Sequence, residues 1–472
     1  MLPAQGKCKN RPVASCLIAC SSDYCIFYRE SNPIFHPFKM AAAPPPEAFT
    51  LPSPPNDGIT ALSYLSTASS SDNDGTSSSS SPSLLACTSW DGALRIYDVG
   101  NCKTTSKLVV QRALNVGPLL SLTIPSNSSG KGGGGGGGDS SLIFVGGANG
   151  SIVSMNMESS SVEIVGSHTA TSNSSTISSG QSSPSPAVSC LAHIGNSHLI
   201  VSAGWDKQIY IWDTRVGSCT KGGGAKPVAS SVLPGKAYSM DISADYNTIV
   251  VSTSGRRNCF FDIRKMMSSS SSSNIVVDPA AVDNDNYGND NYDGNDTIPL
   301  LMDRESSLKY QTRCIKFFGD VTPPTTTTNT ITYGGIAVGS IEGRVAIEYM
   351  DDMGIYYCPT TPAPKKYAFK CHRVNDTVYP VNAIAVHPKY NNTIATGGAD
   401  GTVVTWDAAK KKKISNIMKC STSIAALTYN ATGTQMAIAS SYTFEEGERD
   451  HPREEIYIRN VLDSEVKPKS KK

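Results

Sequence analysis

Short apolar stretches alternate with tight turns along most of the chain, and this pattern predicts β-strands rather than helices. The clearest stretches are LLACTSWDGALRIYD, LIVSAGWDKQIYIWD and TIATGGADGTVVTWD, which end at Asp98, Asp213 and Asp407. In each one an apolar strand enters a turn that contains Asp with Gly or Lys, and an alternating strand then closes on an aromatic residue and Asp. The same motif therefore recurs along the chain.

Weaker copies of this motif fill the gaps between the three clear ones. They end at Asn156, Asp262 and Tyr349, and a last degenerate copy combines MAIASSY with EEIYIRN. Another short strand precedes each copy, which gives seven units. Strand–turn–strand units of about 40–45 residues that end in Trp-Asp are typical of WD40 repeats. Small sheets of this kind bury their faces by packing radially, so the sequence predicts an all-β, seven-bladed WD40 β-propeller in which Trp212 and Trp406 pack between blades.

Low-complexity tracts interrupt the repeats and are expected to remain solvated inserts. They lie near residues 66–83, 126–141, 169–186, 268–298 and 320–330. We name the strands of each unit a to d, and we call the end with the b–c turn end X and the opposite end end Y. Four inserts are expected at end Y and one, near 169–186, at end X, which suggests that end X is kept clear for a partner. The remaining expectations are a disordered extension over 1–54 with a candidate translation start at Met40, a propeller over 55–464 and a basic tail over 465–472.

Composition narrows the functional classes. Lys and Arg number 41 against 40 Asp and Glu, which argues against direct nucleic-acid binding. The sequence contains no apolar run of 18 residues, so it does not predict a membrane span. The 13 cysteines lack paired metal-ligand spacing, so we expect reduced, mostly buried thiols, no metal and no cofactor. No GxSxG, Walker A or paired-carboxylate motif appears, so we do not expect an enzyme. A ubiquitin-ligase adaptor would need an added F-box or helical domain, and none is visible in the sequence.

Four side chains are predicted to share the face at end X. Trp90 and Trp205 lie in b–c turns, Arg313 begins strand a of unit five, and Arg344 follows the b–c turn of that unit. Other units have smaller or aliphatic residues at the Trp position: Ala148, Ser254, Ile341 and Ala399. Exposed indoles are good binding anchors, and guanidinium groups suit carboxylates or phosphates. The alternatives are that each Trp covers a neighbouring loop and that each Arg forms a surface ion pair.

Several longer motifs make a resemblance specific. RESSLKYQTRCIKF, SIEGRVAIEYMD, KKYAFKCHR, YPVNAIAVHP and AIASSYTFEE…HPREEIYIR resemble the WD-repeat member of the Bub (budding uninhibited by benzimidazole) spindle-checkpoint proteins, over roughly residues 55–468. The sister family, the WD-repeat mRNA-export factor that docks on a nucleoporin, is similar in architecture and in some motifs. The span from KYQTR to YAFKCHR is closer to the checkpoint protein.

The resemblance implies a non-catalytic scaffold of the spindle checkpoint. Such proteins bind GLEBS segments of the checkpoint kinase and of its inhibitor relative, and phosphorylated Met-Glu-Leu-Thr repeats of a kinetochore scaffold. They thereby restrain the anaphase-promoting complex. The expected location is the nucleus, with kinetochores in mitosis and some protein in the cytoplasm. The alternative is an mRNA-export factor that docks on a nucleoporin GLEBS segment.

The resemblance also assigns roles to residues of this chain. The family's phosphopeptide surface uses the Trp of two SWD-type turns and the Arg of KYQTR and EGRV, which are Trp90, Trp205, Arg313 and Arg344 here. The second of these turns reads GWD in this chain and keeps the Trp. Weaker candidates, for which solvated surface charge is the alternative, are Lys309, Arg256, Arg257, Lys370 and Arg373.

Overall fold

The computed structural model describes ten stretches of the chain. They are residues 48–65, 83–100, 103–125, 141–168, 186–195, 197–215, 226–264, 296–319, 334–350 and 365–468. The candidate start at Met40 and nearly all residues of the five expected inserts lie outside these stretches. Among the described residues, no helix is long and apolar enough to cross a membrane.

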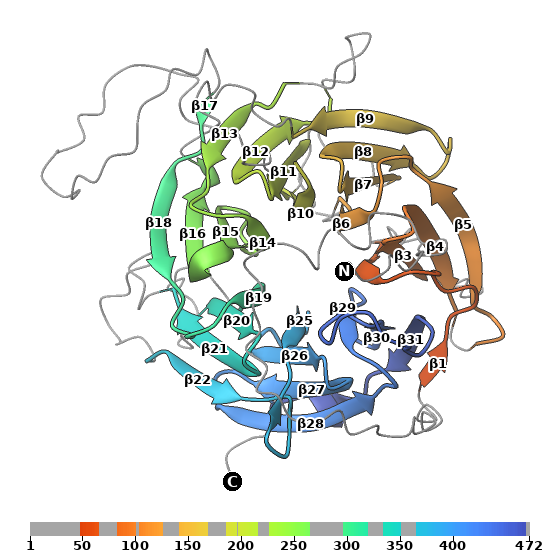
Figure 1. Cartoon of the computed structure of the whole chain (residues 1–472), viewed down its shortest axis with the longest axis vertical. Coiled ribbons are helices and arrows are strands. Elements are labelled where there is room, and N and C mark those ends of the chain that lie inside the picture. The colour runs from red at the N-terminus through yellow and green to blue at the C-terminus, as the bar shows by residue number, and fades with distance from the viewer. Residues whose placement is uncertain are drawn as a thin grey trace, which may run out of the picture.

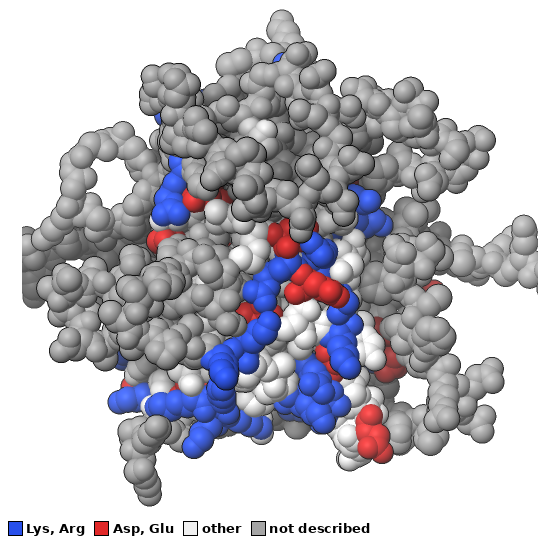
Figure 2. Space-filling model, turned by 90° about the vertical axis from the view of Figure 1, so that its left-hand side faces the viewer, with Lys and Arg blue, Asp and Glu red and all other residues white. Residues whose placement is uncertain are grey.

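Seven sheets stand radially around a common centre and confirm the predicted propeller (Figure 1). Strand a of every sheet lies nearest the centre. Figure 2 shows that many Lys and Arg side chains gather on one flank of the ring.

The strands of the first four blades follow one another in chain order. Blade one contains β2 (Ile59–Tyr64), β3 (Ser83–Ser89), β4 (Ala93–Val99) and β5 (Lys107–Ala113). Blade two contains β6 (Leu119–Thr123), β7 (Leu142–Gly147), β8 (Ser151–Asn156) and β9 (Val162–Ser167). Blade three contains β10 (Val188–His193), β11 (Leu199–Gly204), β12 (Gln208–Asp213) and β13 (Ala229–Val232). Blade four contains β14 (Ala237–Ile242), β15 (Thr248–Thr253), β16 (Arg257–Asp262) and β18 (Leu300–Glu305).

The last three blades complete the ring. Blade five contains β19 (Thr312–Phe318), β20 (Gly335–Ser340), β21 (Arg344–Tyr349) and β22 (Tyr367–Lys370). Blade six contains β25 (Val381–Val386), β26 (Thr393–Gly398), β27 (Thr402–Asp407) and β28 (Lys412–Lys419). Blade seven contains β29 (Ile424–Tyr429), β30 (Gln435–Ser440), β31 (Glu455–Asn460) and β1 (Ala48–Thr50). A small hairpin, β23 (Arg373–Val374) with β24 (Thr377–Val378), follows blade five.

Blade seven joins the two ends of the described chain. Its outer strand is β1, whose Phe49 is paired with Ile458 of β31. The expected boundary at residues 54 and 55 is therefore wrong, because the last blade takes its fourth strand from Ala48–Thr50. The tail also begins later than expected, since the short helix α2 (Asp463–Val466) buries Val466, whose carbonyl accepts a hydrogen bond from Thr393 Oγ1 at 2.7 Å.

The insert expected near 268–298 also ends earlier than predicted. Strand β17 (Asp296–Thr297) pairs in parallel with β13 and extends the edge of blade three. Ile298 is fully buried in the apolar cluster between blades three and four. The end of this tract is thus part of the packed molecule, because one isoleucine fills a position between two sheets.

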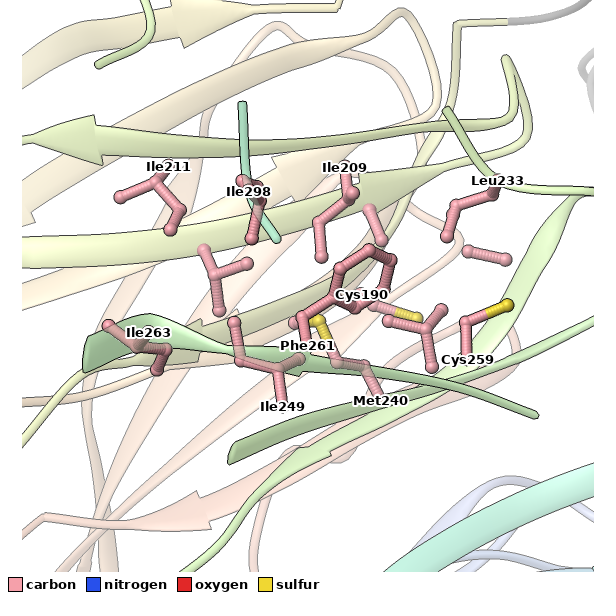
Figure 3. Close-up of a cluster of buried hydrophobic side chains, with 14 of the residues drawn as sticks. Cys190, Ile209, Ile211, Leu233, Met240, Ile249, Cys259, Phe261, Ile263 and Ile298 are labelled. Carbon is pink, nitrogen blue, oxygen red and sulfur yellow. The ribbon is translucent and has the colours of Figure 1, made fainter. Parts of the chain in front are cut away.

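The blades are held together by apolar side chains between neighbouring sheets. Figure 3 shows the cluster between blades three and four, in which Ile209 and Ile211 of one sheet face Ile249 and Phe261 of the next. All four side chains are fully buried. Burying one such side chain contributes about 1.5–3 kcal/mol, so the association of blades supplies what a single small sheet lacks.

The described cysteines belong to this core. Cys87, Cys190, Cys259, Cys314, Cys371 and Cys420 are buried free thiols. Burial raises the pKa of Cys190, Cys314 and Cys420 to about 12. For these six residues the expected burial is observed.

Two side-chain networks tie b–c turns to the preceding loops, and the sequence patterns did not reveal them. In blade three, Trp212 Nε1 donates to Ser202 Oγ at 2.8 Å, and His168 bridges Ser202 and Asp206 at 2.7 and 2.9 Å. Blade six repeats the arrangement with Trp406, Thr396, His372 and Asp400. Trp212 packs with the apolar cluster that includes Phe144 of blade two, and the Trp406 ring lies 4.6 Å from that of Phe369 in blade five, so both indoles pack between blades as predicted.

Candidate peptide-binding face

One backbone hydrogen bond defines equivalent turn positions in all seven blades. The first residue of each b–c turn donates its N–H to the carbonyl of the residue before strand a, over 2.8–3.1 Å. The pairs are Trp90 to Gly58, Ala148 to Pro118, Trp205 to Ala187, Ser254 to Lys236, Ile341 to Gln311, Ala399 to Pro380 and Ser441 to Ser423. Trp90 and Trp205 therefore stand at the same position, at end X, in blades one and three.

Both turn tryptophans are half-exposed. Trp90 rests against the backbone of its own blade, where a Cβ built on Gly58 would approach Trp90 Cδ1 to 3.1 Å. Trp205 precedes Asp206, whose carboxylate His168 holds. Each indole thus has a fixed base and a surface that reaches solvent.

A β-bulge sets the position of Arg313. In every blade the register between strands a and b shifts at the second residue of strand a. The bulged residues are Thr60, Leu120, Ser189, Tyr238, Arg313, Asn382 and Ala425. A bulge redirects its side chain away from the regular pleat, so Arg313 stands at a special position on the innermost strand of blade five.

Arg313 is held by a neutral side chain rather than by a carboxylate. Its Nε donates to Asn382 Oδ1 at 3.2 Å, and no described carboxylate lies within salt-bridge distance of its guanidinium. Asn382 Nδ2 in turn donates to Thr443 Oγ1 at 3.0 Å and to Glu445 Oε1 at 3.4 Å. Ser423 Oγ donates to the other oxygen of Glu445 at 3.2 Å. Blade six thus orients the guanidinium without neutralising it.

Arg344 begins β21 and has a weak ionic partner. Its Nε lies 3.5 Å from Glu342 Oε2, and its side chain is 35% exposed. Glu342 occupies the turn position that Asp206 and Asp400 hold in blades three and six. For Arg344 the ion pair anticipated as the alternative is present, but its Nε atom is buried and forms no hydrogen bond in the described structure.

Of the weaker candidates, two form ion pairs and three are exposed. Arg256 is paired with Glu305 and donates to Leu308 O at 2.9 Å, and Arg257 is paired with Asp303 at 2.8 Å. These two arginines hold the outer strand of blade four. The others are exposed at end X: Lys309, Lys370 and Arg373. Among them, the Nη2 atom of Arg373 donates to the carbonyl of Glu342 at 3.1 Å.

Arg304, in the same RESSLKYQTR segment, has a structural contact. Its Nη2 lies 3.3 Å from Glu348 Oε2, and the Glu348 side chain is 1% exposed. Ser307 Oγ donates to the other oxygen of Glu348 at 2.5 Å. The pair joins blade four to blade five, which leaves Arg313 as the arginine of this segment that lacks an acidic partner among the described residues.

The sequence reasoning missed Asn382, Thr443 and Glu445. The YTFEE motif contains two of them, but nothing local shows that its side chains lie over blade six. No described group of three or more His, Cys, Asp or Glu side chains has the arrangement of a metal site. End X therefore offers two indoles and two guanidinium groups, an arrangement suited to a peptide with apolar and anionic side chains.

Comparison with known proteins adds independent findings. The sequence model of the WD domain, G-beta repeat family matches residues 173–213 and 364–407. The mitotic checkpoint protein bub-3 of Caenorhabditis elegans is 33% identical over 432 residues, which cover 90% of this chain and 96% of that protein. Mitotic checkpoint protein BUB3.1 of Arabidopsis thaliana is 31% identical over 92% of this chain and 98% of its own length. The bub3 protein of Dictyostelium discoideum is 29% identical over 90% of this chain and 98% of its own length.

A second group of relatives is similar over a shorter span. The mRNA export factor of Mus musculus is 39% identical over 178 residues, which cover 36% of this chain and 44% of that protein. The likeness to the checkpoint proteins thus extends over nearly the whole chain, whereas the likeness to the export factor covers little more than a third.

Proposed function

The chain belongs to the Bub3 family of mitotic checkpoint proteins, and on that premise we propose that it is a non-catalytic checkpoint scaffold that binds phosphorylated peptides at end X. The ligand would be a phosphorylated Met-Glu-Leu-Thr repeat of a kinetochore scaffold. Arg313 and Arg344 would bind the phosphothreonine, and Trp90 and Trp205 would contact the apolar Met and Leu side chains.

The environment of Arg313 is the observation that carries this proposal. The half-exposed guanidinium contacts a neutral amide through Nε, so its positive charge is available to an incoming anion. Charge-assisted hydrogen bonds contribute about 1.5–3 kcal/mol each. Glu342 competes for Arg344 through a 3.5 Å contact to Nε, which forms no hydrogen bond in the described structure, and we expect a phosphate dianion to compete with it.

The proposal extends to the other partners of the checkpoint. GLEBS segments of the checkpoint kinase and of its inhibitor relative would dock on the same end. Lys309, Lys370 and Arg373 are exposed there and could pair with acidic side chains of such a segment. Through these partners the protein would reach kinetochores and restrain the anaphase-promoting complex from within the nucleus. A propeller whose candidate binding groups lie on turns suits a scaffold better than an enzyme.

Fluorescence anisotropy with a phosphorylated Met-Glu-Leu-Thr peptide tests the proposal. We expect phosphate-dependent binding that Arg313→Ala weakens at least tenfold. The matched control is Arg215→Ala, because Arg215 is an exposed arginine at end Y paired with Asp213 at 2.6 Å, and it should leave binding unchanged. Equal affinity for the phosphorylated and unphosphorylated peptides would refute phosphate recognition.

The export-factor function is the second candidate, supported by the 39% identity over 178 residues. A nucleoporin GLEBS segment added to the same assay separates the two functions. Binding of that segment without any binding of the phosphopeptide would favour the export factor.

A further inference from the structure

A lysine-rich surface lies at end Y, on the opposite side from the candidate peptide-binding face. Lys365 and Lys366 precede β22 of blade five, and Lys411, Lys412 and Lys413 form the turn into β28 of blade six and its first residues. All five side chains are exposed. Figure 2 shows Lys and Arg side chains gathered over part of one side of the molecule. We call these five residues the blade five–six lysines.

The two halves of this surface are fixed relative to each other. Tyr367 Oη of blade five donates to the carbonyl of Ala408 in blade six at 2.5 Å. Lys411 Nζ lies 4.5 Å from the centroid of the Tyr367 ring, a cation–π contact between the blades. The ring of Phe369 stacks beside Tyr367 and lies 4.6 Å from Trp406. The two groups of lysines therefore flank a side-chain contact that joins blade five to blade six.

Among the described residues, the positive charge of this surface is not paired with carboxylates. None of the blade five–six lysines lies within salt-bridge distance of a described carboxylate. Two carboxylates of these blades are themselves buried: Asp407 is 3% exposed and paired with Lys410 at 3.8 Å, and Glu348 is 1% exposed and faces Arg304. The near balance of the total charge, 41 against 40, thus hides a local excess of cations.

We propose that the blade five–six lysines bind the phosphate backbone of nucleic acid. This inference is independent of the proposed function and departs from the expectation based on total charge. Lysine ammonium groups are compact point charges that neutralise phosphates without requiring the bidentate geometry of arginine. The ring of Tyr367 is not free to stack on an unpaired base, because Lys411 lies over it and Phe369 stacks beside it. We therefore expect this surface to favour duplex DNA, which has the higher charge density, and to contact its phosphates rather than its bases.

Counterion release gives the proposal a quantitative test. Five phosphate contacts predict that log Kobs for duplex DNA falls against log[salt] with a slope of about −4.5. Between 50 and 200 mM salt the affinity falls about 500-fold. The probe is a fluorescent 20-base-pair duplex, titrated with the full chain over a series of salt concentrations.

Two double variants, one in each blade, separate a shared surface from a single charged loop. Lys365→Gln with Lys366→Gln, and Lys412→Gln with Lys413→Gln, each remove two contacts and should reduce the slope to about −2.7. The matched control is Lys103→Gln with Lys107→Gln, because these exposed lysines flank the equivalent turn of blade one at end Y. The control and Arg313→Ala should both leave the slope unchanged. The melting temperature of each variant shows whether it is folded.

Several outcomes would overturn the proposal. These are an absence of binding at 50 mM salt, a slope that only one double variant changes, and a slope that the control changes equally. A poly-glutamate peptide that competes as well as unlabelled duplex would assign the surface to acidic protein partners instead. Arg313→Ala does not alter the blade five–six lysines. The test of nucleic-acid binding and the test of phosphopeptide binding can therefore give opposite answers.

Discussion

Asn382 is the residue whose substitution most directly tests the chemistry of Arg313. Its Oδ1 accepts from Arg313 Nε at 3.2 Å and its Nδ2 donates to Glu445 at 3.4 Å. Asn382→Asp preserves the acceptor, converts the donor into a second acceptor and places a negative charge beside the guanidinium. Asn382→Ala removes the positioning contact and adds no charge. The two variants therefore separate orientation from neutralisation.

The size of the effect follows from the geometry. Two unit charges about 4 Å apart interact by about 1 kcal/mol in water and by about 4 kcal/mol at an effective dielectric constant near 20. The half-exposed Arg313 lies between these limits, so the new carboxylate competes with a phosphate for its charge. We expect Asn382→Asp to weaken phosphopeptide binding about 10- to 150-fold, and Asn382→Ala to weaken it less than about tenfold.

The assay is the anisotropy titration with the phosphorylated Met-Glu-Leu-Thr peptide, repeated at two salt concentrations. The matched control is Asn149→Asp, because Asn149 is an exposed residue of the blade-two turn at end X whose Oδ1 accepts from Ser151 N at 2.9 Å. Asp can make the same contact, so this variant adds a charge to the same end without touching Arg313. Equal losses in Asn382→Asp and Asn149→Asp, or no loss in either, would refute the reasoning.

Two further predictions concern the fold. Leu51→Ala should lower the free energy of unfolding by about 2–5 kcal/mol, because Leu51 follows β1 and is 4% exposed in the core of blade seven. Urea denaturation measures this loss, and a midpoint equal to that of the unaltered protein would contradict the reasoning. Iodoacetamide at pH 8 should leave Cys190, Cys314 and Cys420 unmodified in the native protein. Burial raises the pKa of each to about 12, so that only about one thiol in ten thousand is ionised. Peptide mapping before and after unfolding measures the labelling, and labelling of these positions in the native protein would contradict their burial.

The blades could be predicted from sequence because their signals are local. Alternating strands joined by Asp–Gly turns, such as the one at Asp400 and Gly401, need only a few neighbouring residues to be recognised. The closing strand β1 could not be predicted in the same way. Its partner Ile458 in β31 lies at the other end of the chain, and three residues carry too little pattern to specify a register.

The candidate site was predictable only in part for a similar reason. Strand direction was enough to place Trp90, Trp205, Arg313 and Arg344 at one end. The contact between Arg313 and Asn382 spans 69 residues and depends on the packing of two blades. The ion pairs of Arg256 and Arg257 with Glu305 and Asp303 were hidden because a long tract separates β16 from β18.

The repeat explains how one end of the molecule can acquire binding residues without loss of stability. The turn hydrogen bond is made by backbone atoms in all seven blades, whether the side chain is Trp90, Ala148 or Ser254. The side chain at this position is therefore free to vary.

Blade five differs from blades three and six at the second residue of the b–c turn. In blades three and six the second turn residue is an Asp that a buried His holds at 2.9 Å. In blade five that position is Glu342, and its ionic partner is Arg344, a half-exposed cation at 3.5 Å. The contact at this turn position in blade five is therefore longer than the corresponding Asp–His hydrogen bonds of blades three and six. If the proposed phosphopeptide binds here, we expect Arg344 to exchange Glu342 for a phosphate, whereas Arg313 has no acidic partner to give up among the described residues.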